Sequence, residues 1–166
     1  MTPSLRSYLE SISEDMWHGE RVTIRPLNSE EDLIYAAHEC KLKDEQRDLV
    51  NPVWFSVGRA YLSYENHLPA IIYNEKDERI GFICFSVWVG SGDAYTWSFF
   101  LDERYQGLGY GLDTVRTAVK MIKATDQKRA IKLALEVANV RAHRLYEKIG
   151  FRLLDEKDGD DLVLGL

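Results

Sequence analysis

The feature that most constrains this sequence is a glycine-rich turn between a strand-like segment and a helix-like segment. Residues 94–101 are apolar on both faces, which is typical of a central β-strand. The run QGLGYG follows at 106–111, and a helical pattern of apolar residues then begins, made of Leu112, Val115, Val119 and Ile122. Alternate glycines let the backbone turn tightly and bring its N–H groups close to a ligand. Because a helix N-terminus adds unpaired N–H donors, the turn is a candidate phosphate site, although a turn without a ligand fits the spacing as well.

Two known phosphate-binding motifs do not fit this turn. A P-loop requires Lys followed by Ser or Thr after its last glycine, and Leu112 and Asp113 occupy those positions here. A dinucleotide-binding fold requires GxGxxG early in a parallel sheet. The spacing here is GxGxG, and mostly turn-connected strands precede it. Both nucleotide-binding folds are therefore excluded.

The remaining pattern predicts one mixed α+β domain that spans residues 1–166. Its 45% hydrophobic content is sufficient for one core at this length. Strands are expected at 20–27, 70–73, 79–89, 94–101 and 131–137, with a closing hairpin of 151–154 and 162–166 around an acidic loop at 155–161. Helices are expected at 4–17, 29–40, 56–65, 112–122 and 139–149. Residues 1–18 are interpreted as a helical N-terminal extension of this domain.

Apolar periodicity also predicts which side of the first two helices is buried. In helix 4–17 the apolar stripe consists of Leu5, Tyr8, Leu9, Ile12 and Met16. In helix 29–40 the residues expected to face the core are Leu33, Ala36, Ala37 and Cys40. Ser29 precedes this second helix and is its expected N-cap.

The charge balance and the cysteine pattern exclude several classes of partner. The chain carries 21 basic and 27 acidic residues, and the net charge of −6 argues against a binder of the nucleic-acid backbone. No apolar run approaches the ~18 residues of a membrane span, and acidic residues near the start argue against a signal peptide. Cys40 and Cys84 are isolated, and the histidines show no metal-ligand spacing. We therefore expect a cytoplasmic protein with no metal and without nucleic-acid or membrane partners.

A second motif lies one helix and one strand after the glycine-rich turn. The segment 133–151 reads LALEVANVRAHRLYEKIGF, and its distinctive residues are Asn139, Ala142, Leu145, Tyr146, Lys148, Gly150 and Phe151. Together with Gln106, Gly109 and Gly111, this segment resembles the GNAT superfamily of N-acetyltransferases. That family carries Gln/Arg-x-x-Gly-x-Gly/Ala and then Asn-x-x-Ala-x-x-Leu-Tyr-x-Lys-x-Gly-Phe, and both patterns match in that order. The resemblance covers about residues 20–166, and its specific part lies within 97–151.

The resemblance implies a GNAT fold with acetyl-CoA as cosubstrate. In such a fold one mostly antiparallel sheet is covered by helices on both faces, and the strand ending at Leu101 splays from strand 133–137. The resemblance implies that the pantetheine arm lies between these strands and that the pyrophosphate lies on the 106–112 amides. The implied cofactor-binding residues are Phe99, Leu101, Gln106, Gly107, Leu108, Gly109, Tyr110, Gly111, Leu112, Asn139, Ala142 and Tyr146. A helix cap that contacts no ligand is the alternative role for Asn139.

The resemblance also implies two catalytic positions. Tyr146 corresponds to the tyrosine that protonates the departing thiolate, and a phenol with a pKa of about 10 remains protonated at neutral pH. The alternative is a tyrosine that only packs on the inner face of its helix. The backbone N–H near Leu101 is the implied donor to the thioester carbonyl. Several family members carry a glutamate base where Ala134 stands here, and the other candidates, none of them chosen, are Glu136, Asp102, Glu103 and Glu39.

The sequence says less about the amine that accepts the acetyl group than about the cofactor. Segments 99–109 and 143–146 resemble bacterial spermine/spermidine acetyltransferases, and acidic clusters at 30–48 and 155–161 suit a polycation or are simply solvated. The sequence therefore predicts acetyl transfer to a small primary amine, with spermidine or spermine as candidates. The alternatives are a protein lysine or N-terminal acetyltransferase and a noncatalytic acyl-CoA-binding regulatory module. Tyr146 argues against the noncatalytic module, because a protein that only binds acyl-CoA needs no leaving-group acid. A homodimer is a candidate assembly.

Overall fold

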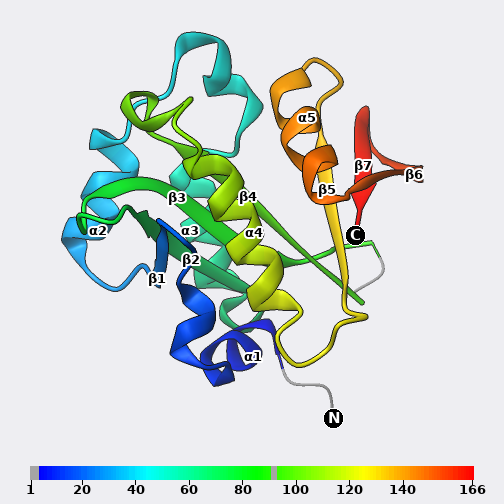
Figure 1. Ribbon diagram of the computed structural model, residues 1–166, viewed down its shortest axis with the longest axis horizontal. Helices are drawn as coiled ribbons and strands as arrows, with labels where there is room; N and C mark the ends of the chain where they lie inside the picture. Colours follow the sequence, from blue (N-terminus) through cyan, green and yellow to red (C-terminus); the bar gives the residue numbers. More distant parts are fainter. Residues whose placement is uncertain (1–3, 91–92) are drawn as a thin grey trace.

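The computed structural model describes residues 4–90 and 93–166 (Figure 1). In these residues, seven strands form one sheet in the order β1-β2-β3-β4-β5-β7-β6. Their bounds are β1 Thr23–Pro26, β2 His67–Tyr73, β3 Arg79–Val87, β4 Ala94–Leu101, β5 Ala130–Leu135, β6 Arg152–Asp158 and β7 Asp161–Gly165. Neighbouring strands are antiparallel except β4 and β5, which are parallel. The predicted mixed, mostly antiparallel α+β sheet is confirmed.

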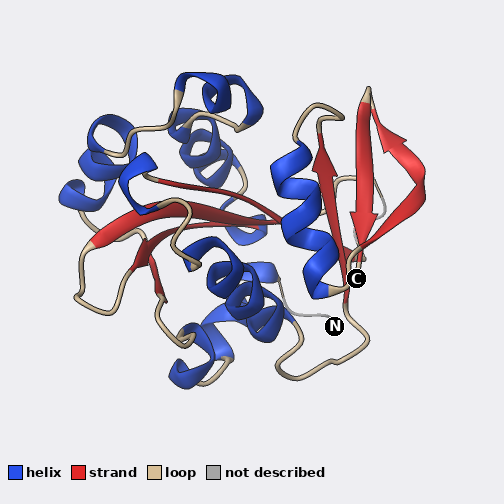
Figure 2. Cartoon of the chain, turned by 45° about the horizontal axis from the view of Figure 1, so that its top comes forward, coloured by secondary structure: helices blue, strands red, loops and turns tan. Residues whose placement is uncertain are grey.

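Helices cover both faces of the sheet, as expected (Figures 1 and 2). They are α1 Leu5–Ser11, α2 Glu30–Ile34, α3 Val53–Leu62, α4 Tyr110–Ile122 and α5 Val140–Ile149. A π-helical turn, Tyr35–Glu39, continues α2, and 3-10 turns occur at Glu14–Trp17, Asp44–Leu49, Tyr64–Asn66 and Glu103–Tyr105. The larger core packs α1, α4 and α5 on one face, and a smaller core around Phe82 packs the π-helical turn and α3 on the other.

The two parallel strands diverge after only two residue pairs. Ala94 pairs with Ala130 and Tyr95 pairs with Ile131, after which β5 pairs with β7 instead. Figure 2 shows α5 and the three C-terminal strands set apart from the rest of the sheet. We call the diverging segments, 96–101 of β4 and 132–135 of β5, the fork. The predicted splayed strand pair is therefore confirmed.

The first predicted helix, 4–17, is interrupted. Helix α1 ends at Ser11, and Ile12 is extended before the 3-10 turn begins. The Ser11 hydroxyl donates to the Tyr8 carbonyl (2.7 Å), a local bond that competes with continuation of the helix. The apolar stripe is nevertheless buried except at Met16, which is partly buried, and the Tyr8 hydroxyl donates to the Ile122 carbonyl (2.7 Å). The residues expected to form an extension thus pack against α4.

The predicted inner face of helix 29–40 is wrong in two positions. Leu33 and Ala37 are exposed, whereas Asp32 and Tyr35 are buried. Asp32 is buried because Arg79 Nε donates to its carboxylate (3.0 Å), and the π-helical turn then shifts the phase of the apolar residues. The expected N-cap is correct, since the Ser29 hydroxyl accepts from the Asp32 amide (3.1 Å).

The predicted acidic loop at 155–161 is mostly strand. Strand β6 continues to Asp158 and β7 begins at Asp161, so that a short turn with Gly159 at φ 61° joins them. β6 is an edge strand whose residues, Leu154 aside, are exposed, and charged residues are therefore compatible with it. The turn expected at 90–93 lies partly outside the described residues. The other predicted elements occur within a few residues of their expected bounds.

Candidate active site

The end of β4 directs backbone donors into the fork. The Asp102 amide donates to the Ile80 carbonyl at the edge of β4 that faces β3 (2.8 Å). Because successive N–H groups of a strand point to opposite edges, the amides of Leu101 and Phe99 point toward β5. The Leu101 carbonyl lies on that side too, where Gln106 Nε2 donates to it (2.9 Å). The Leu101 and Phe99 amides are thus the donors that the diverging β5 leaves without a ladder partner.

The glycine-rich loop leads directly into the N-terminus of α4. Gly107 and Gly109 have φ of 74° and 89°, which residues with a side chain rarely adopt. Gly109 caps the helix without a side chain, and the first helical bond runs from the Asp113 amide to the Gly109 carbonyl (3.3 Å). The first-turn amides, those of Tyr110, Gly111 and Leu112, therefore have no intrahelical acceptor. This backbone fits the oxygens of a diphosphate group.

The segment before β1 holds this loop and the start of α4 in place. Arg21 Nη1 donates to the Leu108 carbonyl (2.6 Å), and its guanidinium lies 4.0 Å from the Tyr110 ring centroid. The Tyr110 hydroxyl donates to Glu75 (2.8 Å), and this bond, together with burial, raises the pKa of Tyr110. The Asp113 carboxylate accepts three backbone amides at 20–22. Sequence reasoning missed these supports, which no local motif marks.

A side-chain amide network connects the loop with two other segments. Gln106 Nε2 donates to Gln46 Oε1 (2.8 Å), and Gln46 Nε2 donates back to Gln106 Oε1 (2.9 Å). The same Gln106 oxygen accepts from Arg141 Nη1 of α5 (3.0 Å). The 3-10 turn that carries Gln46 and the first turn of α5 thus meet at Gln106. Arg141 lies within the second sequence motif, but at a position that the family pattern leaves variable.

Tyr146 is buried beside β4. It is 4% exposed, and its hydroxyl oxygen accepts from Trp97 Nε1 (3.2 Å). Burial raises the pKa of Tyr146, although the Trp97 bond opposes the rise. Because the hydroxyl uses a lone pair for Trp97, its own proton is available for donation. The chemistry available here is that of a neutral general acid.

Helix α5 joins the other predicted residues to this centre. The Asn139 side chain accepts from the Ala142 amide (3.3 Å) and so caps the helix. A Cβ atom built on Gly111 would lie 3.7 Å from Leu145 and 3.8 Å from Leu101. β4, the start of α4 and the inner face of α5 therefore converge beside the fork.

The candidate bases differ in how free they are to take a proton. Asp102 is fully buried, where it accepts from Arg104 Nε (2.8 Å) and from the Lys41 amide (3.1 Å). Burial opposes its ionisation, but these hydrogen bonds outweigh the burial and lower the pKa of Asp102. Its oxygens therefore anchor the backbone, whereas Glu39, Glu103 and Glu136 are exposed.

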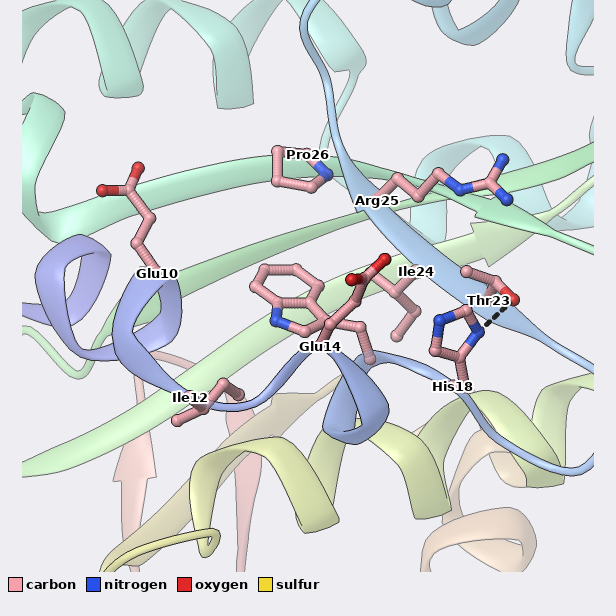
Figure 3. Close-up of a pocket in the computed structure, with 9 residues that line it drawn as sticks. Glu10, Ile12, Glu14, His18, Thr23, Ile24, Arg25 and Pro26 are labelled. Atoms are coloured by element: carbon pink, nitrogen blue, oxygen red, sulfur yellow. Dashed lines mark hydrogen bonds between the residues drawn. The ribbon is translucent and has the colours of Figure 1, made fainter.

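Two surface hollows lie outside the fork. One, of about 380 Å³, is bounded by α1, the Glu14–Trp17 turn and the outer edge strand β1, with Glu10, Glu14 and Arg25 among its residues (Figure 3). The other, of about 490 Å³, is lined by Glu136, Val137, Ala138, Asp158, Asp160 and Asp161. The second is acidic and directly follows the end of β5.

The described residues contain no group of three or more His, Cys, Asp or Glu side chains suited to a metal ion. Burial raises the pKa of the Cys40 and Cys84 thiols to about 11. In residues 4–90 and 93–166, no helix is long and apolar enough to cross a membrane.

Comparison with known proteins places this geometry in a family. The family model described as the acetyltransferase (GNAT) family matches residues 31–151. The spermine/spermidine N(1)-acetyltransferase of Bacillus subtilis (strain 168) is 29% identical over 96 residues, which cover 54% of this chain and 62% of that protein. The matched region thus spans less than two thirds of that relative.

Solved structures share the fold at lower identity. The aminoglycoside acetyltransferase AAC(6')-Ib in complex with coenzyme A has a TM-score of 0.70 at 23% identity, covering 87% of this chain and 94% of that chain. Spermidine N-acetyltransferase from Vibrio cholerae, in complex with CoA and spermine, has a TM-score of 0.68 at 15% identity with the same coverage. The chain belongs to the acetyltransferase (GNAT) family. The expected GNAT fold is therefore confirmed, and the family to which the chain belongs is one of acetyltransferases.

Proposed function

We propose that this chain transfers the acetyl group of acetyl-CoA to a primary amine at the fork. The observation that carries the proposal is the divergence of β4 from β5, which leaves the Leu101 and Phe99 amides facing the space beside β5. An extended pantetheine arm can pair with these amides as a further strand would. The first-turn amides of α4 then receive the diphosphate.

The chain's own groups supply two parts of the chemistry. The Leu101 amide donates to the thioester carbonyl oxygen, where negative charge develops as the amine nitrogen forms its bond to the carbonyl carbon. When the carbon–sulfur bond breaks, Tyr146 gives its proton to the sulfur. The amine loses its own proton to water before or during attack, and Tyr146 regains a proton from solvent afterwards.

We further propose a polyamine as the acceptor. The acidic hollow at the end of β5 supports this choice, because its carboxylates lie beside the fork and attract a polycation. The name of the Bacillus subtilis relative supports it as well. While one nitrogen reacts, the remaining ammonium groups pair with these carboxylates.

The test is a thiol-release assay with spermidine and with a monoamine of similar length. We expect a higher kcat/KM for spermidine at low salt and a smaller advantage at high salt, since screening weakens exposed ion pairs. The double variant Asp158→Asn, Asp160→Asn should reduce this advantage, whereas Glu10→Gln, Glu14→Gln in the hollow beside β1 should not. Equal values for both amines at both salt concentrations would reject the polyamine acceptor and leave acetyl transfer in place. Absence of thiol release with every amine would reject acetyl transfer itself.

A further inference from the structure

Arg141 is an exposed cation that reaches from α5 to the first residue of the glycine-rich loop. It lies in the first turn of α5, and its Nη1 donates to Gln106 Oε1 (3.0 Å). Arg79 and Arg104 form ion pairs with aspartates, but in the described part of the chain no carboxylate lies within 4.0 Å of the Arg141 guanidinium. Arg141 therefore holds a full positive charge beside the loop and has only a neutral oxygen as its partner.

The orientation of the Gln106 amide is determined by its neighbours. Its Nε2 group has two acceptors, the Leu101 carbonyl (2.9 Å) and Gln46 Oε1 (2.8 Å). Its oxygen must then face the donors from Gln46 and Arg141. If the Gln106 amide were flipped, its NH₂ group would face the N–H donors of Gln46 and Arg141. The hydrogen bonds from these two donors would then be lost. The Leu101 carbonyl, which can only accept, and the Gln46 amide thus together keep the oxygen of Gln106 turned toward Arg141.

We propose that Arg141 binds the diphosphate of acetyl-CoA together with the first-turn amides of α4, and that Gln46 positions it through Gln106. The inference rests on the proposed use of acetyl-CoA. Neutral amides at 110–112 fit phosphate oxygens but carry no net charge, and the chain as a whole is negative at −6. A guanidinium held at the first residue of the loop supplies the missing charge, and its planar donors match a phosphate group.

The experiment measures binding rather than turnover, by calorimetry with three probes. CoA carries both the diphosphate and a 3′-phosphate, 3′-dephospho-CoA keeps the diphosphate, and pantetheine has neither. Arg141→Gln removes the charge but keeps a donor, and Gln46→Leu removes only the positioning amide. Arg144→Gln is the matched control, since Arg144 is exposed on the same helix and forms no hydrogen bond to Gln106 among the described residues. Circular dichroism verifies that each variant is folded.

We expect Arg141→Gln to weaken CoA and 3′-dephospho-CoA binding about 10- to 100-fold, the range of a hydrogen bond to a charged group. Pantetheine binding should not change, Gln46→Leu should show a smaller loss with the same two probes, and Arg144→Gln should resemble the wild type. Unchanged CoA affinity in Arg141→Gln would overturn the inference, as would an equal loss for pantetheine. A loss for CoA but not for 3′-dephospho-CoA would assign Arg141 to the 3′-phosphate and also overturn it. A wild-type protein that binds none of the three probes would instead contradict the proposed function.

Discussion

The two arms of the fork differ in how firmly they are packed. In the arm formed by β4 and α4, the inner helix face is fully buried at Val115, Ala118, Met121 and Ile122. In the arm formed by β5, α5 and the C-terminal hairpin, Tyr146 is the one buried residue among the ten of α5, and β6 is almost entirely exposed. The arms meet through two β4–β5 pairs and through the side-chain bonds of Tyr146 with Trp97 and of Arg141 with Gln106.

The two arms that differ in packing also differ in the roles that we propose for their residues. The well-packed arm carries the glycine-rich loop and the Leu101 amide, which we propose to receive phosphate and carbonyl oxygens and which must keep a fixed shape for that role. The lightly packed arm carries Tyr146 and Arg141, for each of which we propose a role that depends on a single polar group. We therefore expect substitutions in the first arm to change cofactor affinity or stability, and conservative substitutions in the second to change catalysis or binding without unfolding the protein.

Tyr146→Phe should have the largest effect. It removes one hydroxyl and keeps the ring against Phe151, so that packing is nearly unchanged. Loss of a general acid typically costs ~10²–10⁴-fold in rate, and we expect kcat to fall within that range while calorimetry shows nearly unchanged acetyl-CoA affinity. Tyr61→Phe, at a tyrosine that is 86% exposed, is the control. Full kcat in Tyr146→Phe, at a pH where chemistry limits turnover, would make Tyr146 a packing residue only.

Gly109→Val should have the next largest effect, on binding. Gly109 has φ 89°, and a branched side chain would both strain the loop and approach Arg21, whose Nη1 lies 3.4 Å from the Cβ position. Loss of several amide–phosphate bonds should weaken CoA binding by about 100-fold. Gly159→Val is a matched control, because Gly159 has φ 61° in the β6–β7 turn and, its chain neighbours aside, no atom of the described residues lies within 4 Å of its Cβ position. Equal CoA affinity in the two folded variants would remove the loop from the cofactor site.

Asp102→Asn should have the smallest effect, and on stability rather than chemistry. An amide cannot accept the bonds from both Arg104 and the Lys41 amide as a carboxylate does, and we expect a loss of about 1–2 kcal/mol in the free energy of unfolding. Urea titration measures this loss, with Asp126→Asn at an exposed ion pair as control.

The pH dependence of unfolding sharpens this prediction. Because the folded state lowers the pKa of Asp102, the carboxylate stabilises the protein above the ordinary aspartate pKa of about 3.9 and loses that contribution as the pH falls through the lowered value. The stability of Asp102→Asn should therefore depend less on pH in this acid range. An identical acid dependence in the variant and the wild type would contradict the assignment of Asp102 as an ionised anchor.

Much of the fold could be predicted because it depends on neighbours along the chain. The apolar period of α4, the Asn139 cap and the Gly150 end of α5 are local features, and the structure places them as expected. The errors arose where a distant residue overrides a local pattern. Asp32 is buried because Arg79 pairs with it, and β6 tolerates charged residues because it lies at the edge of the sheet.

The sequence by itself determined the family, the order of the elements and the two motifs that mark the fork. These features could be predicted because apolar periodicity and glycine spacing depend only on residues that are close together along the chain. Only the tertiary structure decided which groups support those motifs. Gln46 meets Gln106 across 60 positions, and Arg21 meets the Asp113 carboxylate across 92. A hydrogen bond depends on the distance between two atoms in space, which no pattern along the chain records until the sheet and its helices bring those atoms together.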